Sequence, residues 1–284
     1  MENKIAVVVD STTTLPQGFL TDLEIQSAPA IIIWGDEELR DGVDIQADEF
    51  YQRLATAKEM PSTSQATPVM FKEIYEDLST RGFEILAVTI SSKLSGMYAS
   101  AMQAKESLRQ ARIEVVDSLT GTMTIGMSLG RMFEEMKKGA SLEKCRQTLE
   151  HALENTGVIF TVETLEFLHR GGRIGGAAKF LGSALQLKPI LEVVNGAFEG
   201  REKIRTRSKA LERLVDLTIE RIGDRRPVEI TALHANAEDV AHKLIEMVEE
   251  RIETVRTYVT AVSPAVGVHL GPGTVGLAFM AGIE

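Results

Sequence analysis

The fold class follows from one stretch of sequence, FEILAVTISSKLSGMYASAMQAKESLRQ, which occupies residues 83–110. Its first part, 83–90, is an apolar run with several β-branched residues, which is typical of a buried strand. Its last part, 96–110, is rich in alanine and in other residues that favour helices. Three serines and a glycine lie at the junction, at positions 91, 92, 95 and 96. A buried strand that passes through a short polar turn into a helix is the repeating unit of a parallel sheet covered by helices.

The same alternation runs through the first half of the chain. Further runs typical of strands are KIAVVVD (4–10), SAPAIIIW (27–34), RIEVVD (112–117) and TGVIFTV (156–162). Further helical patterns cover 47–57, 67–82, 124–139 and 142–153. Near-continuous apolar strands separated by helices predict a parallel sheet with helices on both faces, an α/β/α domain over residues 1–155.

The second half has a different pattern. Within 184–206, two strand-like segments flank Asn195-Gly196, a dipeptide that favours a hairpin turn. Helical patterns over 209–223 and 237–252 then alternate with strand patterns over 227–234, 254–262 and 273–282. A hairpin combined with crossover helices predicts a mixed α+β domain over 156–284. Because no Pro/Gly/Ser-rich linker separates the two domains, we expect them to pack closely with a cleft between them.

Composition narrows the classes of function. The chain has 284 residues and a formal net charge of −10, which argues against a nucleic-acid-binding surface because phosphate backbones require a positive field. No apolar run resembles a signal peptide or reaches the ~20 residues that span a bilayer. The single cysteine, Cys145, lies in a helical pattern, is expected to be an ordinary helical residue and cannot form an internal disulfide. These observations favour a cytoplasmic protein without a nucleic-acid partner.

Turns rich in hydroxyl side chains connect several predicted strands and helices. They cover residues 10–13, 62–67, 91–96 and 117–120. In an open parallel sheet, the turns after the strands gather at one edge, where ligands bind. Free N–H groups at helix N-termini there suit a phosphate or a carboxylate. The same residue types also cap helices, as we expect of Thr67 before Pro68. Four such turns on one predicted edge favour an anion site.

Several other chemistries can be weighed from short motifs. A serine hydrolase lacks support because the residues around Ser95 do not form G-x-S-x-G. No pair of histidines has metal-ligand spacing, so we expect no metal site. The segment LHRGGRIGGAAKF (168–180) either presents Arg170 and Arg173 to an anion or ends one helix and begins another. His269 precedes a Gly-Pro-Gly turn that we expect to aim it into the cleft. The GPGTVG motif that follows leads into a strand, so it does not indicate a dinucleotide loop.

Taken in order, the motifs resemble the successive signatures of the DegV family. They run from residue 5 to residue 280 and read VVVDSTTTLP, PSTSQATP, ISSKLSGMYASA, VVDS, LHRGGRIG, LKPIL, REKIRTRSKAL and HLGPGTVG. Characterised members are bacterial fatty-acid-binding proteins, the FakB subunits of a fatty acid kinase. The resemblance implies an apolar tunnel between two domains that sequesters one long-chain fatty acid, with no cofactor and no catalytic activity of the chain alone. It also implies an ATP-dependent kinase partner that phosphorylates the carboxylate. The acyl phosphate then passes to acyltransferases of phospholipid synthesis, with transient contact to a membrane surface.

The resemblance further implies roles for individual residues. Thr63, Ser95 and the N–H of Gly96 would bind the carboxylate, with His269 and Arg173 close by. The residue that would dock the kinase is Arg205, whose basic neighbours are Arg201, Lys203 and Arg207. Candidate tunnel walls are Ile31, Ile32, Ile33, Phe160, Phe180, Leu181 and Phe279. Where the family often has TSQPS, this chain has TSQAT, so Ala66 lacks the rigidity of proline while Thr67 keeps a hydroxyl cap.

Two other functions stay open for the same cleft. One is an acyl or phosphoryl transferase that uses the hydroxyl groups and His269. The other is a sensor that binds a different small acid. The lack of a nucleotide-binding loop in the sequence favours a carrier that presents its ligand to another protein.

Overall fold

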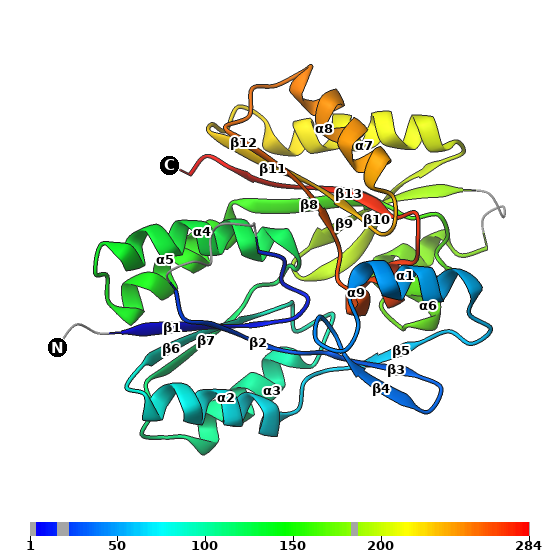
Figure 1. Cartoon of the computed structure of the whole chain (residues 1–284). Helices are drawn as coiled ribbons and strands as arrows, with labels where there is room; N and C mark the ends of the chain where they lie inside the picture. The colour runs from blue at the N-terminus through cyan, green and yellow to red at the C-terminus, as the bar shows by residue number, and fades with distance from the viewer. Residues whose placement is uncertain (1–3, 16–22, 183–186, 284) are drawn as a thin grey trace.

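The computed structural model describes residues 4–15, 23–182 and 187–283, and two sheets organise the chain (Figure 1). The N-terminal sheet has the order β2-β1-β6-β7 and all its pairs are parallel. Its strands are β1 (Ile5–Asp10), β2 (Ile25–Ala28), β6 (Glu84–Thr89) and β7 (Ile113–Asp117). The predicted parallel α/β sheet is therefore confirmed.

Helices cover both faces of this sheet. They are α2 (Pro68–Thr80) and α3 (Met97–Ser107) on one face, and α4 (Met123–Lys137) and α5 (Leu142–Glu154) on the other. Successive side chains of β1 point to opposite faces of the sheet. Ala6 and Val8 therefore pack under α2 and α3, while Val7 packs under α4 and α5. Thr67 caps α2 as predicted, because its hydroxyl accepts the N–H of Met70 at 3.2 Å.

The C-terminal sheet is mixed, with the order β10-β9-β8-β13-β11-β12. Its strands are β8 (Thr156–Thr161), β9 (Lys188–Val194), β10 (Ala197–Ile204), β11 (Val228–His234), β12 (Arg256–Ala261) and β13 (Val275–Ala281). Only the β11–β12 pair is parallel in the described part of this sheet. The predicted hairpin at Asn195-Gly196 is confirmed, and both residues have the positive φ of a tight hairpin turn. Residues Ala184 to Gln186 of the predicted strand, like Pro16 of the first motif, lie outside the described residues.

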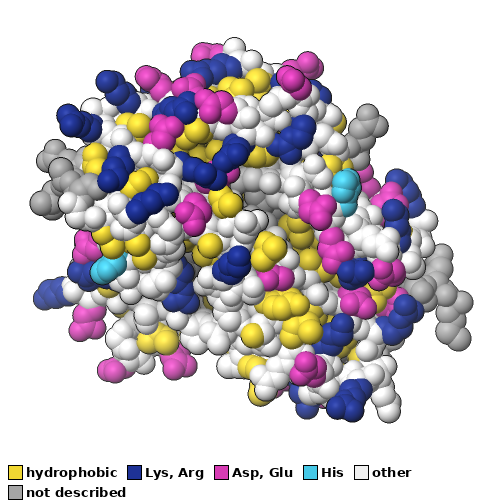
Figure 2. All heavy atoms as spheres, turned by 180° about the vertical axis from the view of Figure 1, so that it is seen from behind, with side chains coloured by type: hydrophobic (Ala, Val, Ile, Leu, Met, Phe, Trp, Pro, Cys, Tyr) yellow, Lys and Arg dark blue, Asp and Glu magenta, His cyan; other side chains and the backbone are white. Residues whose placement is uncertain are grey.

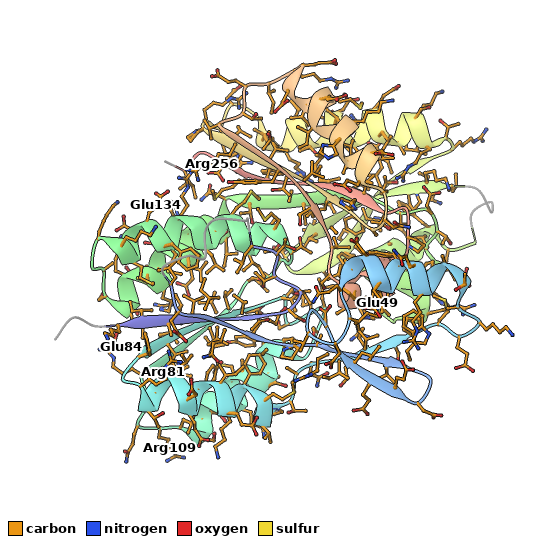
Figure 3. All side chains as sticks on the ribbon, viewed as in Figure 1. Glu49, Arg81, Glu84, Arg109, Glu134 and Arg256 are labelled. Carbon is orange, nitrogen blue, oxygen red and sulfur yellow. The ribbon has the colours of Figure 1, made fainter. Side chains whose placement is uncertain are left out.

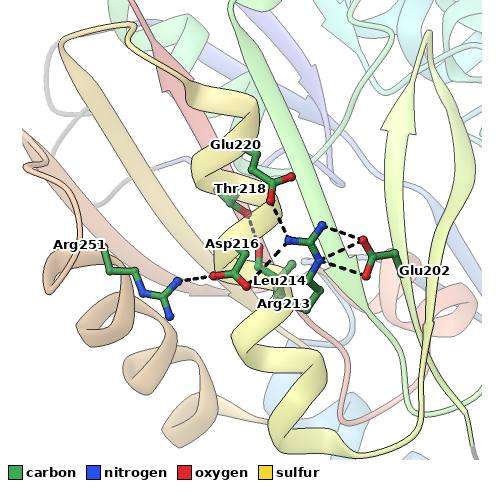
Figure 4. Close-up of polar contacts among 7 residues, drawn as sticks. All are labelled: Glu202, Arg213, Leu214, Asp216, Thr218, Glu220 and Arg251. Carbon is green, nitrogen blue, oxygen red and sulfur yellow. Dashed lines mark hydrogen bonds and ion pairs between the residues drawn. The ribbon is translucent and has the colours of Figure 1, made fainter.

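Two helices cover the outer face of this sheet, α7 (Arg207–Ile222) and α8 (Glu238–Glu249). Arg213 of α7 bonds Glu202 of β10 at 2.9 Å and Glu220 at 2.7 Å, while Arg251 pairs with Asp216 (Figure 4). The inner face packs on α4, which therefore lies between the two sheets (Figure 1). The predicted boundary between residues 155 and 156 falls where the chain leaves α5 for β8.

The prediction of one strand over 27–34 is wrong. Pro29 lacks an N–H group and has a fixed φ, so the chain breaks there into β2 and β3 (Ile31–Trp34), which belong to different sheets. β3 forms a small antiparallel sheet with β4 (Glu37–Arg40) and β5 (Ser62–Ser64), and α1 (Ala47–Thr56) lies between β4 and β5 in the chain. The turn at 62–67 thus belongs to this small sheet, and only the other three hydroxyl-rich turns lie at the edge of the parallel sheet.

Three short helices complete the described chain. They are α6 (Glu166–Arg170), the 3₁₀ helix η1 (Gly175–Phe180) and α9 (Pro264–Leu270). The segment 168–180 therefore contains helix ends rather than one flexible loop. The sequence pattern did not predict α9. Because His269 lies in this helix, the helix and not the Gly-Pro-Gly turn positions it. Although α9 belongs to the C-terminal half, it packs against α1, β3 and β5 as well as α6 (Figure 1).

Among the polar contacts that join the halves, two lie at opposite ends. Arg131 of α4 forms an ion pair of 2.7 Å with Glu229 of β11, whose side chain is 5 % exposed. Glu134 and Arg256 flank this pair on the same side of the molecule (Figure 3). At the other end, Ser91 donates its hydroxyl to the carbonyl of Gly196 at 2.7 Å. Within the described residues, no helix is long and apolar enough to cross a membrane.

Candidate functional site

A cavity with two adjoining chambers lies between the halves. The polar chamber has about 530 Å³ and the apolar chamber about 510 Å³ of space not filled by atoms, which includes space open to solvent. The two chambers adjoin each other, because they share five apolar lining residues: Ile90, Leu94, Phe198, Val266 and Leu270. The polar side chains of Thr63, Ser95, Arg173 and His269 line only the polar chamber, so the cavity is polar at one end and apolar at the other.

Thr63 and His269 meet in the polar chamber. Thr63 lies on β5 and His269 on α9, yet Thr63 Oγ1 and His269 Nε2 are 2.7 Å apart. Burial, together with the nearby charge of Arg173, lowers the pKa of His269 to about 4, so the imidazole is neutral at pH 7. His269 Nδ1 is buried with no hydrogen-bond partner among the described residues.

Gly171 allows His269 to reach this position. A Cβ atom at residue 171 would lie 2.1 Å from His269 Nδ1, far inside van der Waals contact. The backbone of Gly171 is helical, so the reason for a glycine here is the close approach of the ring rather than an unusual φ.

Ser95 and Gly96 lie where the chain passes from β6 into α3. Ser95 lines the polar chamber half-buried, and within the described part of the chain no group bonds its hydroxyl. Gly96 is the residue that precedes the first turn of α3, and a Cβ there would lie 2.9 Å from the side chain of Gln65. By contrast, Ser91 is buried and its hydroxyl is bonded to Gly196. Ser95 is thus the serine of this turn that lines the chamber with an unbonded hydroxyl, since Ser92 is exposed and does not line it.

Arg173 supplies a positive charge to the polar chamber. Its guanidinium donates to the carbonyls of Leu94 at 3.1 Å and Gly171 at 2.7 Å. Among the described residues, no carboxylate lies within ion-pair distance of it. With a neutral imidazole and several hydroxyls around it, this charge makes the chamber suitable for a carboxylate or another small anion.

The apolar chamber is lined mainly by side chains of the C-terminal sheet. Phe160 of β8 and Phe198 of β10 stack edge to face with ring centroids 5.1 Å apart, and both line the chamber. Val158, Val193, Leu233 and Val262 complete most of its apolar wall.

The other candidate tunnel residues lie elsewhere. Phe279 is on the opposite face of β13, in the core under α7 and α8, because side chains alternate along a strand and Gly276 faces the chamber instead. Ile31 and Ile33 are half-buried on β3 and Ile32 is buried, and none of them is among the described lining residues. Phe180 and Leu181 line a separate groove with Pro189 and Lys203.

Arg205 lies at the surface between β10 and α7. It is exposed, and the described residues provide no carboxylate partner for it. Its basic neighbours are engaged: Arg201 pairs with Glu192, Arg207 with Glu163, and Lys203 lies over the ring of Phe180. Arg170, another predicted anion ligand, pairs with Glu166 at the surface. Seen from behind, Lys and Arg side chains gather on the C-terminal half, and hydrophobic side chains surround a hollow near the centre (Figure 2).

The five residues that line both chambers were not among the predicted walls. Ile90 precedes the serine-rich turn and Leu94 lies within it, and this turn was predicted only as an anion site. Phe198 follows the predicted hairpin turn. The alternation of side chains along that strand could have indicated which of its residues face the cavity. Val266 and Leu270 lie on α9, which is too short for a helical period to be recognised. Cys145 lies in a helix as predicted, and it is buried in α5. Within the described residues, no cluster of three His, Cys, Asp or Glu side chains is arranged to hold a metal ion.

Comparison with known proteins identifies the family. A model of the DegV family of uncharacterised proteins matches residues 4–282. A DegV domain-containing protein of Halalkalibacterium halodurans is 32% identical over 277 residues, which cover 97% of this chain and 98% of that protein.

Solved structures agree with this assignment. One is described as showing fatty acid binding of a DegV family protein from Thermus thermophilus. It is 32% identical with a TM-score of 0.91, and the match covers 98% of this chain and 99% of that one. Another is DegV of Bacillus subtilis, described as a fatty-acid-binding protein, with 30% identity, a TM-score of 0.85 and coverage of 98% and 99%. This chain therefore belongs to the DegV family.

Proposed function

We propose that the protein is a fatty-acid-binding carrier that sequesters one long-chain fatty acid in the two-chambered cavity. The observation that carries the proposal is the polarity of the cavity, with hydroxyls and Arg173 at one end and an apolar wall at the other. The relatives from Thermus thermophilus and Bacillus subtilis, described as fatty-acid-binding, support the same ligand class.

The carboxylate would lie in the polar chamber. An unpaired charge in such a site is very unfavourable, so the carboxylate needs donors. Ser95, the Gly96 N–H, Thr63 and Arg173 are the candidates. Each methylene of the acyl chain buried in the apolar chamber contributes ~0.8 kcal/mol to binding.

His269 would orient the donor of Thr63. The neutral imidazole carries its proton on Nδ1 or Nε2, and Nδ1 has no acceptor in the described structure. A proton on Nε2 avoids a buried unpaired N–H, and Nε2 then donates to Thr63 Oγ1. The hydroxyl hydrogen of Thr63 is thereby free to point at the carboxylate.

The carrier would present this carboxylate to a partner, an ATP-dependent fatty acid kinase. The acyl phosphate would then pass towards phospholipid synthesis. Arg205 is the proposed docking residue because it is exposed and has no carboxylate partner among the described residues. In this proposal the chain binds and presents, and the kinase supplies the nucleotide chemistry.

Mass spectrometry of the lipid that copurifies tests the proposal. The expected result is one bound long-chain fatty acid per chain, or stoichiometric uptake after delipidation. A cavity that stays empty in both measurements would refute it. Binding of short acids with no preference for chain length would favour the small-acid sensor, and turnover of an activated acyl or phosphate substrate by the isolated chain would favour a transferase.

A further inference from the structure

Asp41 carries a buried carboxylate. It belongs to the N-terminal half and lies beside the start of α9, which belongs to the C-terminal half. Asp41 directly follows β4, is 1% exposed, and donates its N–H to the carbonyl of Ala30 at 2.8 Å. Its Oδ2 atom accepts the hydroxyl of Ser11 at 2.7 Å. The hydroxyl of Ser263 and the N–H of Ala265 face it from the start of α9 through weaker contacts that lower its pKa. Its Oδ1 atom is buried and has no closer partner in the described part of the chain.

The helix that Asp41 faces carries much of the polar chamber. Four of the seven residues of α9 line it: Ala265, Val266, His269 and Leu270. A helix this short has little stability of its own, so its position depends on its contacts. At Gly267 it packs against α1, where a Cβ would lie 2.4 Å from the hydroxyl of Tyr51. Small shifts of α9 therefore move His269 relative to Thr63.

We propose that Asp41 is a positioning residue for the ligand chamber, which holds the start of α9 against the N-terminal half and thereby sets where His269 meets Thr63. Only the identity of the ligand rests on the proposed function; the positioning of His269 does not.

The chemistry of the pocket around Asp41 suits a carboxylate. Ser11 donates a hydrogen bond to it, and the Ser263 hydroxyl and the Ala265 N–H at the start of α9 are close enough to lower its pKa, while an ionised carboxylate only accepts. Burial, with a smaller contribution from the nearby Asp10, raises its pKa to about 6, so Asp41 is ionised at pH 7.5. The other titratable group that faces it is Tyr51 of α1. An asparagine at this position would direct the N–H donors of its amide towards donors that now face the carboxylate.

Titration of His269 by two-dimensional NMR of the ligand-free protein tests the proposal. In the wild type the pKa is expected at about 4. In Asp41→Asn and Asp41→Ala, the displaced ring is less buried, so its pKa should rise by about one unit or more towards ~6.5, the ordinary value of histidine. The His269→Gln variant lacks the imidazole signals of His269 and so identifies them in the spectrum. General destabilisation of a folded protein would leave this native-state pKa in place, so the readout is specific to positioning.

Asp44→Asn is the matched control, since Asp44 lies three residues away, is partly exposed and pairs with Arg40. It should leave the pKa of His269 unchanged. If Asp41→Ala does not fold, Asp41→Asn and Ser263→Ala carry the test.

Fatty-acid affinity gives the second readout. It should fall about tenfold in the Asp41 variants and stay unchanged in Asp44→Asn. A folded Asp41→Asn protein with His269 still at about 4 would overturn the proposal. If the wild type binds no fatty acid but the pKa moves as expected, the proposed function fails and the positioning role stands.

Discussion

Replacement of Gly171 by alanine is the sharpest test of the polar chamber. The new Cβ would lie 2.1 Å from His269 Nδ1 and 2.9 Å from Cε1. Ordinary contact begins at 3.4 Å, so the ring must retreat by about 1.3 Å. We expect a movement of this size to disrupt the contact between Nε2 and Thr63 Oγ1, which is 2.7 Å long and depends on the position of the ring.

The expected loss can be worked from these contacts. Without His269, the hydroxyl of Thr63 is no longer oriented towards the carboxylate, and a hydrogen bond to a charged group contributes ~1.5–3 kcal/mol. Fatty-acid affinity should therefore fall by roughly 10- to 150-fold. Overpacking at residue 171 should also lower the free energy of unfolding by ~1–3 kcal/mol.

Binding is measured by titration calorimetry with a delipidated protein, and stability by urea unfolding. Gly172→Ala is the matched control. It introduces the same methyl group next door into open space, but at a φ of +70° that alanine adopts with strain. It should cost about 1 kcal/mol of stability and leave binding intact. The reasoning is refuted if Gly171→Ala folds and binds fatty acid within twofold of the wild type, or if both variants lose affinity equally.

Four further changes give separate tests. Ser95→Ala should weaken fatty-acid binding by ~1.5–3 kcal/mol with little change in stability, whereas Ser91→Ala should lower stability and leave affinity unchanged in the same calorimetric and urea assays; the reverse pattern would exclude Ser95 from the site. Arg131→Met removes one partner of the buried ion pair between the halves and should cost ~3–5 kcal/mol in urea unfolding, and a loss below 1 kcal/mol would contradict this. Acidification from pH 6.5 to pH 4 should have two opposing effects on stability. The unfolded chain protonates histidine before the folded protein protonates His269, which destabilises by about 3 kcal/mol, while folded Asp41 takes up its proton first, which stabilises by a similar amount. Asp41→Asn should therefore make stability fall more steeply over this range, and an unchanged slope would show that Asp41 does not titrate there. Arg205→Ala should leave fatty-acid affinity intact but slow phosphorylation in the presence of a fatty acid kinase, and equal rates would remove it from the proposed docking surface.

Local sequence chemistry predicted much of the fold. The parallel sheet followed from apolar β-branched runs alternating with helices, because strands buried on both faces need apolar residues throughout. The hairpin followed from Asn195-Gly196 and the cap of α2 from Thr67 and Pro68, since each depends on a few neighbouring backbone groups. Pro29 is itself a local signal for a break in the strand. The apolar residues on both sides nevertheless favoured a single strand over 27–34.

The site depended on contacts that no local pattern records. Thr63 and His269 are 206 residues apart and meet only because α9 of one half packs into the small sheet of the other. Their common site was expected from family resemblance, not from their own surroundings. Likewise, Phe279 and Phe198 are both aromatic residues on strands, yet one lies in the core under α7 and α8 and the other lines the cavity. A side chain's face depends on strand register and on what covers each face of the sheet, and both are set by packing across the whole chain.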